Sequence, residues 1–304
     1  MTQPSVSVVI PTHNRPGPLR RAVQSVIDQG YDGRLEIIVV FDASEIEAPE
    51  VTPDPRVTLR TINNSRSRGL AGARNSGIMA AHHAFVAFLD DDDYWLANKL
   101  EYQMAIFQAR PATILVGTAM RVCGGVVEHD RLLPFEVIRH PDLVRDRLAA
   151  LHSSSLIFRR SALVGELGLV DEDLPRSYGE DYDMLLRASL IAPIEVVNLP
   201  LVAVTWQGES YFFGRWAVYA SALQYLLAKH PQFGDDRRAV GRIESQVAFA
   251  LAAGGDAPQA RIWARRALGH DVLQLKAALA LAISLRLVSA DRVVRTARRF
   301  GKGI

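Results

Sequence analysis

Cysteine is nearly absent from this sequence, because Cys123 is the only one among 304 residues. A single thiol cannot build a framework of intrachain disulfides, and such a chain is typical of the reducing cytoplasm. The first residues also lack the basic start and the apolar core of a signal peptide. We therefore expect a cytoplasmic protein that is not secreted.

Long apolar segments are missing as well. Residues 277–285 form an apolar run near the C-terminus, but the run has nine residues, whereas a helix needs about 20 to cross a bilayer. No G-x-G-x-x-G follows the first predicted strand, and no Walker A motif occurs. NAD-dependent dehydrogenases and P-loop phosphotransferases are therefore disfavoured.

The composition is that of a globular protein, but the charge is unevenly distributed. Hydrophobic residues make up 49% and charged residues 22%, and the length suits one large domain with an appendage. Residues 237–304 contain 13 Lys/Arg and 4 Asp/Glu, a net charge of +9, whereas residues 1–236 contain 22 and 29, a net charge of −7. Such a basic tail suits an anionic membrane face, a protein partner or nucleic acid.

Strand and helix patterns alternate over the first 90 residues. Apolar and β-branched runs predict strands over residues 5–10, 35–41, 57–62 and 84–89. Apolar residues at helical spacing predict a helix after the first strand and another over residues 71–81. The pattern indicates βαβ units in a mostly parallel sheet covered by helices, with ligand groups at the carboxyl ends of the strands.

Four consecutive carboxylates, Asp90 to Asp93, directly follow the fourth predicted strand. Adjacent like charges repel one another unless something positive lies among them. Carboxylate oxygens in this position suit Mg²⁺ or Mn²⁺, which one or two carboxylates and the phosphates of a substrate would hold. An acidic loop without a ligand is the alternative, because Asp is also a common turn residue.

Five short motifs appear in a fixed order along the chain. They are Val9-Ile10-Pro11-Thr12-His13-Asn14-Arg15, Val39-Val40-Phe41-Asp42, Gly72-Ala73-Arg74-Asn75, Leu89 to Asp93 with Tyr94-Trp95, and Gly179-Glu180-Asp181-Tyr182-Asp183. In this order and spacing, across about residues 5–210, the chain resembles family 2 glycosyltransferases. The resemblance implies the nucleotide-sugar-binding GT-A fold and an inverting transfer from a nucleoside-diphosphate sugar to a hydroxyl.

The resemblance also implies a donor site. Its nucleotide-sugar contacts would be Pro11, Thr12, Asn14, Asp42, Gly72, Arg74, Asn75, Asp90, Asp91 and Asp92. Asp42 would accept a hydrogen bond from the imide N–H of uracil or thymine, which favours UDP or dTDP. Asp90 and Asp92 match the Asp-x-Asp motif of the family, but the extra Asp leaves the ligand register open. We expect Mn²⁺ or Mg²⁺ on Asp92, with Asp93 as an adjacent ligand candidate and with Asp90 and Asp93 near the ribose or the waters of the metal. Helix capping by Thr12 and turn closure by Asp42 remain alternatives.

The resemblance further implies a catalytic base at Asp181, which would take the proton of the attacking hydroxyl. The N-terminus of the predicted helix lowers the pKa of this carboxylate and weakens it as a base, so desolvation or the neighbouring Glu180 must oppose that effect. Acids that only stabilise the helix dipole are the alternative. His152, Glu180 and Trp206 are candidates for the acceptor side.

We therefore expect a GT-A domain over residues 1–212 and a basic helical region over residues 213–304, which would contact a membrane, the acceptor or a second copy. The Gln-x-x-Arg-Trp pattern of processive synthases is missing. The resemblance thus implies metal-dependent transfer of a single sugar, without a nucleic-acid partner. The basic tail adds the hypothesis that the acceptor is a lipid-linked or cell-surface glycan, on the cytoplasmic face of the membrane. The alternatives are a non-catalytic nucleotide-sugar or lipid-binding module and a sugar-1-phosphate nucleotidyltransferase.

Overall fold

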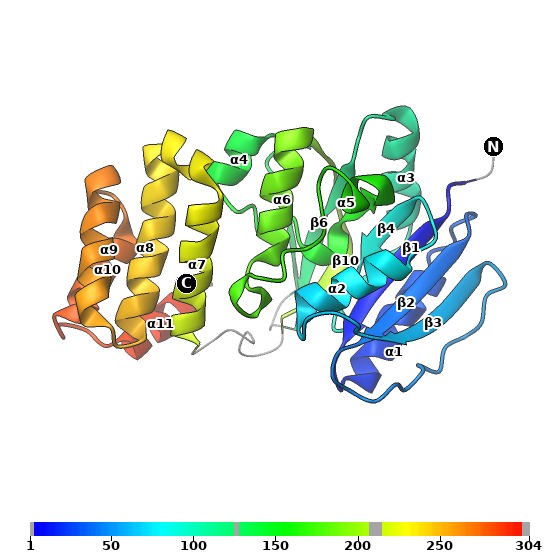
Figure 1. The fold of residues 1–304 in the computed structure, drawn as a ribbon, viewed down its shortest axis with the longest axis horizontal. Coiled ribbons are helices and arrows are strands. Elements are labelled where there is room, and N and C mark those ends of the chain that lie inside the picture. Colours follow the sequence, from blue (N-terminus) through cyan, green and yellow to red (C-terminus); the bar gives the residue numbers. More distant parts are fainter. Residues whose placement is uncertain (1–2, 125–127, 207–214, 300–304) are drawn as a thin grey trace. The chain divides into compact units, whose positions relative to one another are not determined.

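A ten-stranded sheet with the order β3-β2-β1-β4-β9-β6-β10-β5 forms the centre of the N-terminal part (Figure 1). The computed structural model describes residues 3–124, 128–206 and 215–299. The strands are β1 (Val6–Thr12), β2 (Leu35–Phe41), β3 (Val57–Asn63), β4 (Phe85–Phe88), β5 (Tyr94–Trp95), β6 (Leu115–Cys123), β7 (His129–Arg131), β8 (Val137–Ile138), β9 (Ile157–Arg159) and β10 (Ile194–Thr205). β7 pairs with β6, and β8 pairs with β10.

The six longest strands of the described sheet run in one direction. β1 pairs in parallel with β2 and β4, β2 with β3, and β10 with β6. The short strand β9 is antiparallel to both β4 and β6, so these two strands are parallel to each other. The predicted α/β fold with a mostly parallel sheet is confirmed, and so are the four strands predicted within the first 90 residues.

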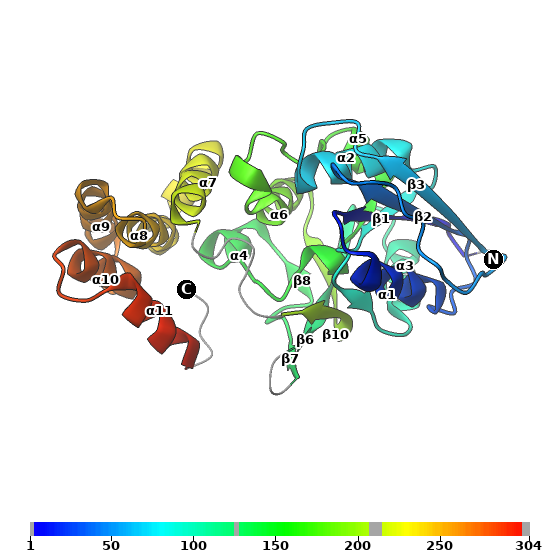
Figure 2. The same ribbon diagram turned by 90° about the horizontal axis from the view of Figure 1, so that it is seen from below.

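Helices cover both faces of the sheet. The helices between β1 and β10 in the chain are α1 (Pro16–Ile27), α2 (Leu70–Ala80), α3 (Lys99–Ala109), α4 (His140–Arg145), α5 (Arg160–Val164) and α6 (Glu180–Ile191). Figure 2 shows α1 and α3 on one side of the strands and α2 on the other. Val8 belongs to the core beneath α1 and α3, whereas a Cβ on Gly77 of α2 would lie 2.3 Å from Val9 on the opposite face. Period-two alternation along β1 therefore decides which helix each side chain meets.

A buried carboxylate, Glu36 of β2, stabilises the α2 side of the sheet. It accepts hydrogen bonds from Ser7 Oγ at 2.7 Å, Arg60 Nη1 at 2.6 Å and the backbone N–H of His82 at 3.0 Å. Burial opposes ionisation of Glu36, but the hydrogen bonds from Ser7, His82 and Arg60 outweigh it and lower its pKa to about 2. The negative charge is thus part of the folded structure.

Helices make up the C-terminal part: α7 (Trp216–Lys229), α8 (Arg237–Ala253), α9 (Ala257–His270), α10 (Leu275–Ser284) and α11 (Ala290–Arg299). Alanines dominate the core between α8, α9 and α10, which brings these helix backbones close together. Asp236 and Asp256 cap α8 and α9 by accepting backbone N–H bonds. None of the described helices combines the length and the apolar character needed to cross a membrane.

The chain forms two compact units. The first contains the described residues within 1–143, 147–173 and 180–208, and the second those within 144–146, 174–179 and 209–304. The predicted domain boundary, between residues 212 and 213, lies outside the described residues. All the site residues discussed next belong to the first unit.

Candidate active site

The four carboxylates stand where the sequence places them, at the carboxyl end of β4. Leu89 N donates to Val9 O at 3.1 Å and continues the ladder with β1, and Asp93 N donates to Asp90 O at 3.1 Å and closes a turn. Because β1, β2 and β4 are parallel, Asp42 and the acidic turn follow strands that end at the same edge of the sheet. The side chains of the four acids nevertheless face two different sets of neighbours.

Asp90 and Asp93 lie with His152, and ligand atoms of all three are within 4.8 Å of one another. A 3-10 turn, Ser153–Ser155, supports this cluster from the side of β9. Ser153 Oγ donates to Asp90 Oδ2 at 3.0 Å, and Ser154 Oγ donates to Asp93 Oδ2 at 2.6 Å. We call Asp90, Asp93 and His152 the acidic cluster.

Asp91 and Asp92 face the end of β1 and the start of α1. Thr12 Oγ1 donates to Asp91 Oδ2 at 2.7 Å. Arg15 Nη1 contacts Asp91 Oδ1 at 3.2 Å and Asp92 Oδ2 at 2.8 Å. The metal ligands expected from the sequence were Asp92 and Asp93, but the structure groups Asp93 with Asp90 and His152 and places the exposed Asp92 carboxylate against Arg15.

The donor set of the acidic cluster fits a divalent cation. Ser154 N donates to His152 Nδ1 at 3.3 Å, and His152 Nδ1 lies 3.4 Å from Asp93 Oδ2. A ring nitrogen of imidazole has one lone pair, so Nδ1 would bind a cation in place of the hydrogen bond from Ser154. Two carboxylates and one imidazole are ligands that Mn²⁺ accepts, whereas Mg²⁺ prefers oxygen alone.

The charges of the turn respond to burial and to one another. Burial opposes ionisation of Asp90, but Arg74 and His152 outweigh it and hold the pKa of Asp90 below its usual range. Burial, with a contribution from Asp90, raises the pKa of Asp93 to about 7 despite His152. Burial also raises the pKa of Asp91 to about 6, although the hydrogen bond from Thr12 opposes the shift. Of the four acids, Asp90 alone has a pKa lowered by its surroundings, whereas the pKa values of Asp91, Asp92 and Asp93 are raised.

Arg74 joins the acidic cluster to the start of α6. Its side chain is 1% exposed, and its Nη2 lies 2.5 Å from Asp90 Oδ1 while its Nη1 pairs with Glu180. Burial raises the pKa of Glu180 to about 7, and Arg74 opposes the shift only in part. Arg74, a predicted nucleotide-sugar contact, thus forms a buried bridge between two carboxylates.

Asp181, the predicted base, is held by Arg147. Arg147 Nη2 lies 3.0 Å from both carboxylate oxygens of Asp181. Burial opposes ionisation, but Arg147 and His152 outweigh it and keep the pKa of Asp181 below its usual range. Sequence reasoning missed Arg147, because it stands alone in a loop without a motif. Asp183, in the same helical turn, pairs with Arg187 and is structural.

The predicted nucleotide contacts are mostly hydrogen-bonded within the protein. Asp42 Oδ1 accepts from Asn64 Nδ2 at 2.8 Å, and Asp42 Oδ2 accepts from Gly69 N at 2.9 Å. Asn75 Nδ2 donates to Val170 O at 2.8 Å. These bonds fix the corner formed by β2, β3 and α2 around the strand ends.

The remaining predicted residues differ in exposure. Pro11 is buried in β1, and Asn14 is exposed with a left-handed φ of 53°. A Cβ on Gly72 would lie 1.9 Å from Ser67 O, so this position requires glycine. Trp206 is exposed, and the Arg131 guanidinium lies 4.7 Å from its ring centroid. Thr205 donates its backbone N–H to Asp93 Oδ1 at 3.0 Å. Trp206 therefore directly follows a residue that contacts the acidic cluster.

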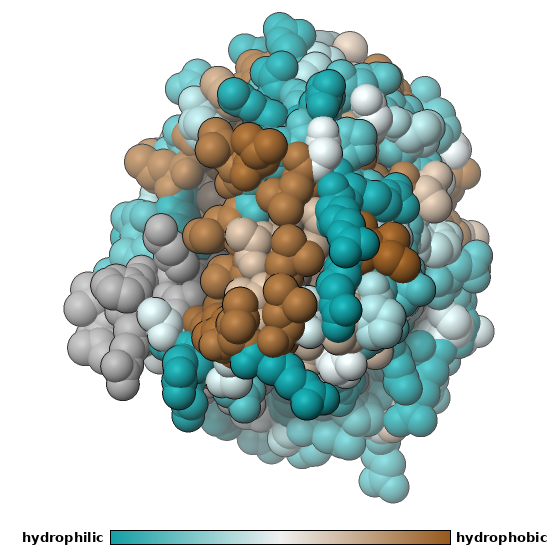
Figure 3. Space-filling model, turned by 90° about the vertical axis from the view of Figure 1, so that its left-hand side faces the viewer, coloured by the Kyte–Doolittle hydropathy of each residue, from teal (hydrophilic) through white to brown (hydrophobic). Residues whose placement is uncertain are grey.

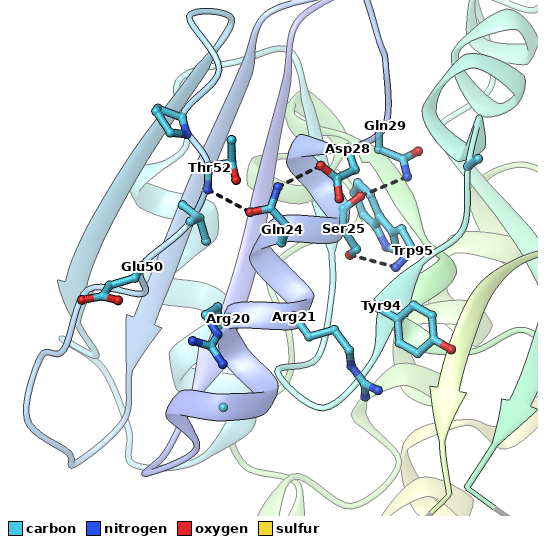
Figure 4. Close-up of a pocket in the computed structure, with 14 residues that line it drawn as sticks. Arg20, Arg21, Gln24, Ser25, Asp28, Gln29, Glu50, Thr52, Tyr94 and Trp95 are labelled. Carbon is cyan, nitrogen blue, oxygen red and sulfur yellow. Dashed lines mark hydrogen bonds between the residues drawn. The ribbon is translucent and has the colours of Figure 1, made fainter.

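A cavity of about 1070 Å³ lies beside α1, β5 and residues 50–53, and none of its lining residues belongs to the predicted site (Figure 4). Figure 4 shows Gln24 bridging Asp28 and Thr52 across this cavity. Arg21 lines it too and donates to Asp92 O at 3.0 Å, so the cavity adjoins the outer side of the acidic turn.

Comparison with protein families gives a match to the model described as "Glycosyl transferase family 2" over residues 7–164, just over half of the chain. A similar curated protein is UDP-Glc:alpha-D-GlcNAc-diphosphoundecaprenol beta-1,3-glucosyltransferase WfgD of Escherichia coli, 30% identical over 37% of this chain and 44% of that protein. The putative colanic acid biosynthesis glycosyl transferase WcaA of Escherichia coli (strain K12) is 29% identical over 60% and 66%. The succinoglycan biosynthesis protein ExoO of Rhizobium meliloti is 30% identical over 61% and 56%. The chain spans less than two thirds of the length of each of these relatives.

Solved structures share the fold at low sequence identity. S. aureus TarS 1-349, crystallised with UDP-GlcNAc, matches with a TM-score of 0.62 and 16% identity, over 98% of this chain and 92% of that chain. The mannosyltransferase PcManGT from Pyrobaculum calidifontis, in complex with GDP-Man and Mn2+, matches with a TM-score of 0.54 and 20% identity, over 98% and 85%. These similarities confirm the GT-A fold.

Proposed function

Because this chain belongs to glycosyl transferase family 2, we propose that it transfers a single sugar, with inversion, from a nucleoside-diphosphate sugar to a hydroxyl of a lipid-linked or cell-surface glycan. The observation that carries this proposal is the buried bridge between the acidic cluster and the start of α6. Arg74 contacts Asp90 of the cluster and also Glu180, the residue next to Asp181. A candidate metal site and a candidate base thus belong to one connected set of charged side chains.

Different residues would perform the separate roles in such a reaction. Asp90, Asp93 and His152 would hold Mn²⁺ or Mg²⁺, which supplies Lewis-acid stabilisation of the departing diphosphate. Asp181 is ionised and can accept the proton of the attacking hydroxyl. Arg147 keeps that carboxylate charged in the described state, so Asp181 becomes a stronger base if the acceptor displaces Arg147 from it.

The donor we propose is a UDP- or dTDP-sugar. Each oxygen of the Asp42 carboxylate accepts one hydrogen bond within the protein, and a carboxylate oxygen can accept a second. Capacity therefore remains for the imide N–H of uracil or thymine. TarS was crystallised with UDP-GlcNAc, and the name of WfgD gives UDP-Glc as a donor, which supports a uridine nucleotide here.

The acceptor we propose is lipid-linked or part of a growing polysaccharide, at the cytoplasmic face of the membrane. The name of WfgD specifies a diphosphoundecaprenol acceptor, and those of WcaA and ExoO specify polysaccharide biosynthesis. The basic C-terminal region, with 13 Lys/Arg against 4 Asp/Glu over residues 237–304, suits an anionic surface of this kind.

Calorimetric titration tests the donor site. UDP-, dTDP- and GDP-sugars are added with and without Mn²⁺ to the wild type, to Asp93→Asn and to Asp92→Asn. We expect one donor to bind in a metal-dependent way, and Asp93→Asn to weaken that binding far more than Asp92→Asn. The opposite order would support the ligand pair expected from the sequence, and binding of no donor would refute the proposed function.

A kinetic comparison tests the base. Asp181→Asn should lower kcat by about 10²- to 10⁴-fold while leaving KM for the donor nearly unchanged, because it removes a proton acceptor and no donor contact. Asp173→Asn, an exposed acid in the loop before α6, serves as the matched control. Metal-dependent donor binding without turnover in the wild type would favour a binding module instead.

A further inference from the structure

Helix α10 is apolar on nearly all sides, and the protein leaves one of them exposed, at Leu275 and Ala278. Leu279, Leu281 and Ile283 are partly buried against the core of the C-terminal helices. Its sequence, LKAALALAIS, contains one charged residue, Lys276. Ala277, Ala280 and Ser284 are buried and face α8 and α9. Helices that are hydrophobic all round are normally buried in a protein core or in lipid, so the outer face of α10 lacks the cover that its sequence suits.

Apolar side chains are concentrated at both ends of this helix. Of the large apolar residues that the structure describes, the four most exposed are Leu273 at 81%, Val272 at 79%, Leu287 at 76% and Leu275 at 70%. Leu285 is exposed beside them. We call these five residues the α10 surface. Figure 3, which views the side of the molecule where Figure 1 shows α9 and α10, has hydrophobic residues gathered in its middle and hydrophilic ones around them.

The turn after α10 carries an arginine in a position that favours glycine. Arg286 N donates to Ile283 O and Leu287 N donates to Ala282 O, both at 2.9 Å, which is the Schellman pattern of helix ends. Arg286 has a φ of 61°, a conformation that costs free energy for any residue with a Cβ. Helix termination alone therefore does not explain an exposed arginine between Leu285 and Leu287.

Arginines follow the α10 surface in the chain. Arg286 lies between two of its leucines, and Arg292 and Arg295 of α11 are exposed. The acids of this stretch are the part-buried Asp271 and the exposed Asp291 on the first turn of α11. A symmetric pair of chains that met through this surface would bring the arginines of both copies together, and like charges oppose such a contact. Apolar side chains with arginines around them instead match the acyl chains and the anionic headgroups of a bilayer.

We infer that the α10 surface docks this protein onto an anionic phospholipid bilayer, with α10 lying in the interface and Arg286, Arg292 and Arg295 at the headgroups. The inference rests on the proposed function in one respect, because it brings the enzyme to the membrane that carries a lipid-linked acceptor. α10 has ten residues, so it lies along the surface and does not cross the bilayer.

Vesicle sedimentation of the full chain tests this inference. The probes are vesicles of equimolar phosphatidylglycerol and phosphatidylcholine, and vesicles of phosphatidylcholine alone. We expect the wild type to bind the anionic vesicles at low salt, and Leu273→Ser with Leu287→Ser to weaken binding by about tenfold or more. Arg292→Gln with Arg295→Gln should weaken it by about tenfold and flatten its salt dependence. Leu132→Ser, an exposed leucine of the first unit, is the matched control and should bind like the wild type.

Three results would overturn the inference. The first is a wild type that stays in the supernatant with anionic vesicles. The second is a Leu132→Ser variant that loses as much binding as the double leucine variant. The third is a wild type that sediments as a dimer in solution and becomes monomeric with Leu273→Ser and Leu287→Ser, since this would assign the surface to a second copy. Metal-dependent donor binding is measured in parallel on each variant, and its retention would show that only the membrane inference has failed.

Discussion

The buried bridge of Arg74 allows a quantitative test of how the site is built. Arg74→Met keeps most of the side-chain volume but removes the only cation that the structure describes in direct contact with both Asp90 and Glu180. Removal of one partner from a buried ion pair typically costs about 3–5 kcal/mol, because the remaining charge loses its compensation. Two carboxylates lose a partner here, so we expect a cost in the upper half of that range at pH 8.

The cost should depend on pH in a defined direction. Burial already raises the pKa of Glu180 to about 7 with Arg74 present, and loss of the guanidinium raises it further. A carboxyl whose pKa is higher in the folded than in the unfolded state destabilises the fold once the pH exceeds the unfolded value of about 4.3. The deficit of Arg74→Met should therefore be smaller at pH 5 than at pH 8.

Urea denaturation measures the effect through the fluorescence of Trp95, which is buried in the same unit. Adding Glu180→Gln to Arg74→Met removes one of the two uncompensated charges and should restore about 0.5–3 kcal/mol. Arg56→Met, which breaks an exposed pair with Asp54, is the control and should leave the unfolding midpoint nearly unchanged. A loss below about 1 kcal/mol for Arg74→Met at pH 8, or a loss independent of pH, would refute the reasoning.

Three further substitutions test other parts of the first unit. Gly72→Ala places a Cβ 1.9 Å from Ser67 O, so we expect a lower melting temperature and weaker donor binding; unchanged values for both would contradict the close approach. Glu36, whose pKa is lowered to about 2, should contribute about 3 kcal/mol above pH 4.5 that is lost as the pH falls to 2, and acid unfolding of Glu36→Gln should lack this loss. Lys99 is fully buried, which lowers its pKa well below the usual value, so Lys99→Met should stabilise the protein at pH 7 and reduce the rise of stability towards pH 10. Destabilisation would instead show that the hydrogen bond from Lys99 Nζ to Gln103 Oε1, or the amine over the Trp95 ring, outweighs the cost of burial.

The positions of the strands and of the first helices can be predicted from local sequence patterns. Central parallel strands are buried on both faces and therefore appear as continuous apolar runs, which is how residues 35–41 were predicted to form β2. Helix α1 has one apolar stripe, and its buried residues are those that recur at helical spacing. The direction of strand β9 does not follow from the sequence, because three residues carry no pattern that distinguishes antiparallel from parallel pairing.

Some features of the site also follow from local patterns, and others depend on the fold. The sequence by itself determined that four carboxylates follow a buried strand and that Glu180 and Asp181 begin a helix, since charge and strand ends are local properties. The tertiary structure alone decided which carboxylates meet. A turn of four residues directs Asp90 and Asp93 towards the Ser153–Ser155 turn and Asp91 and Asp92 towards Arg15, and no local pattern records that choice. Residues separated by about 60 positions in the chain form the acidic cluster, because the sheet order brings β9 next to β4.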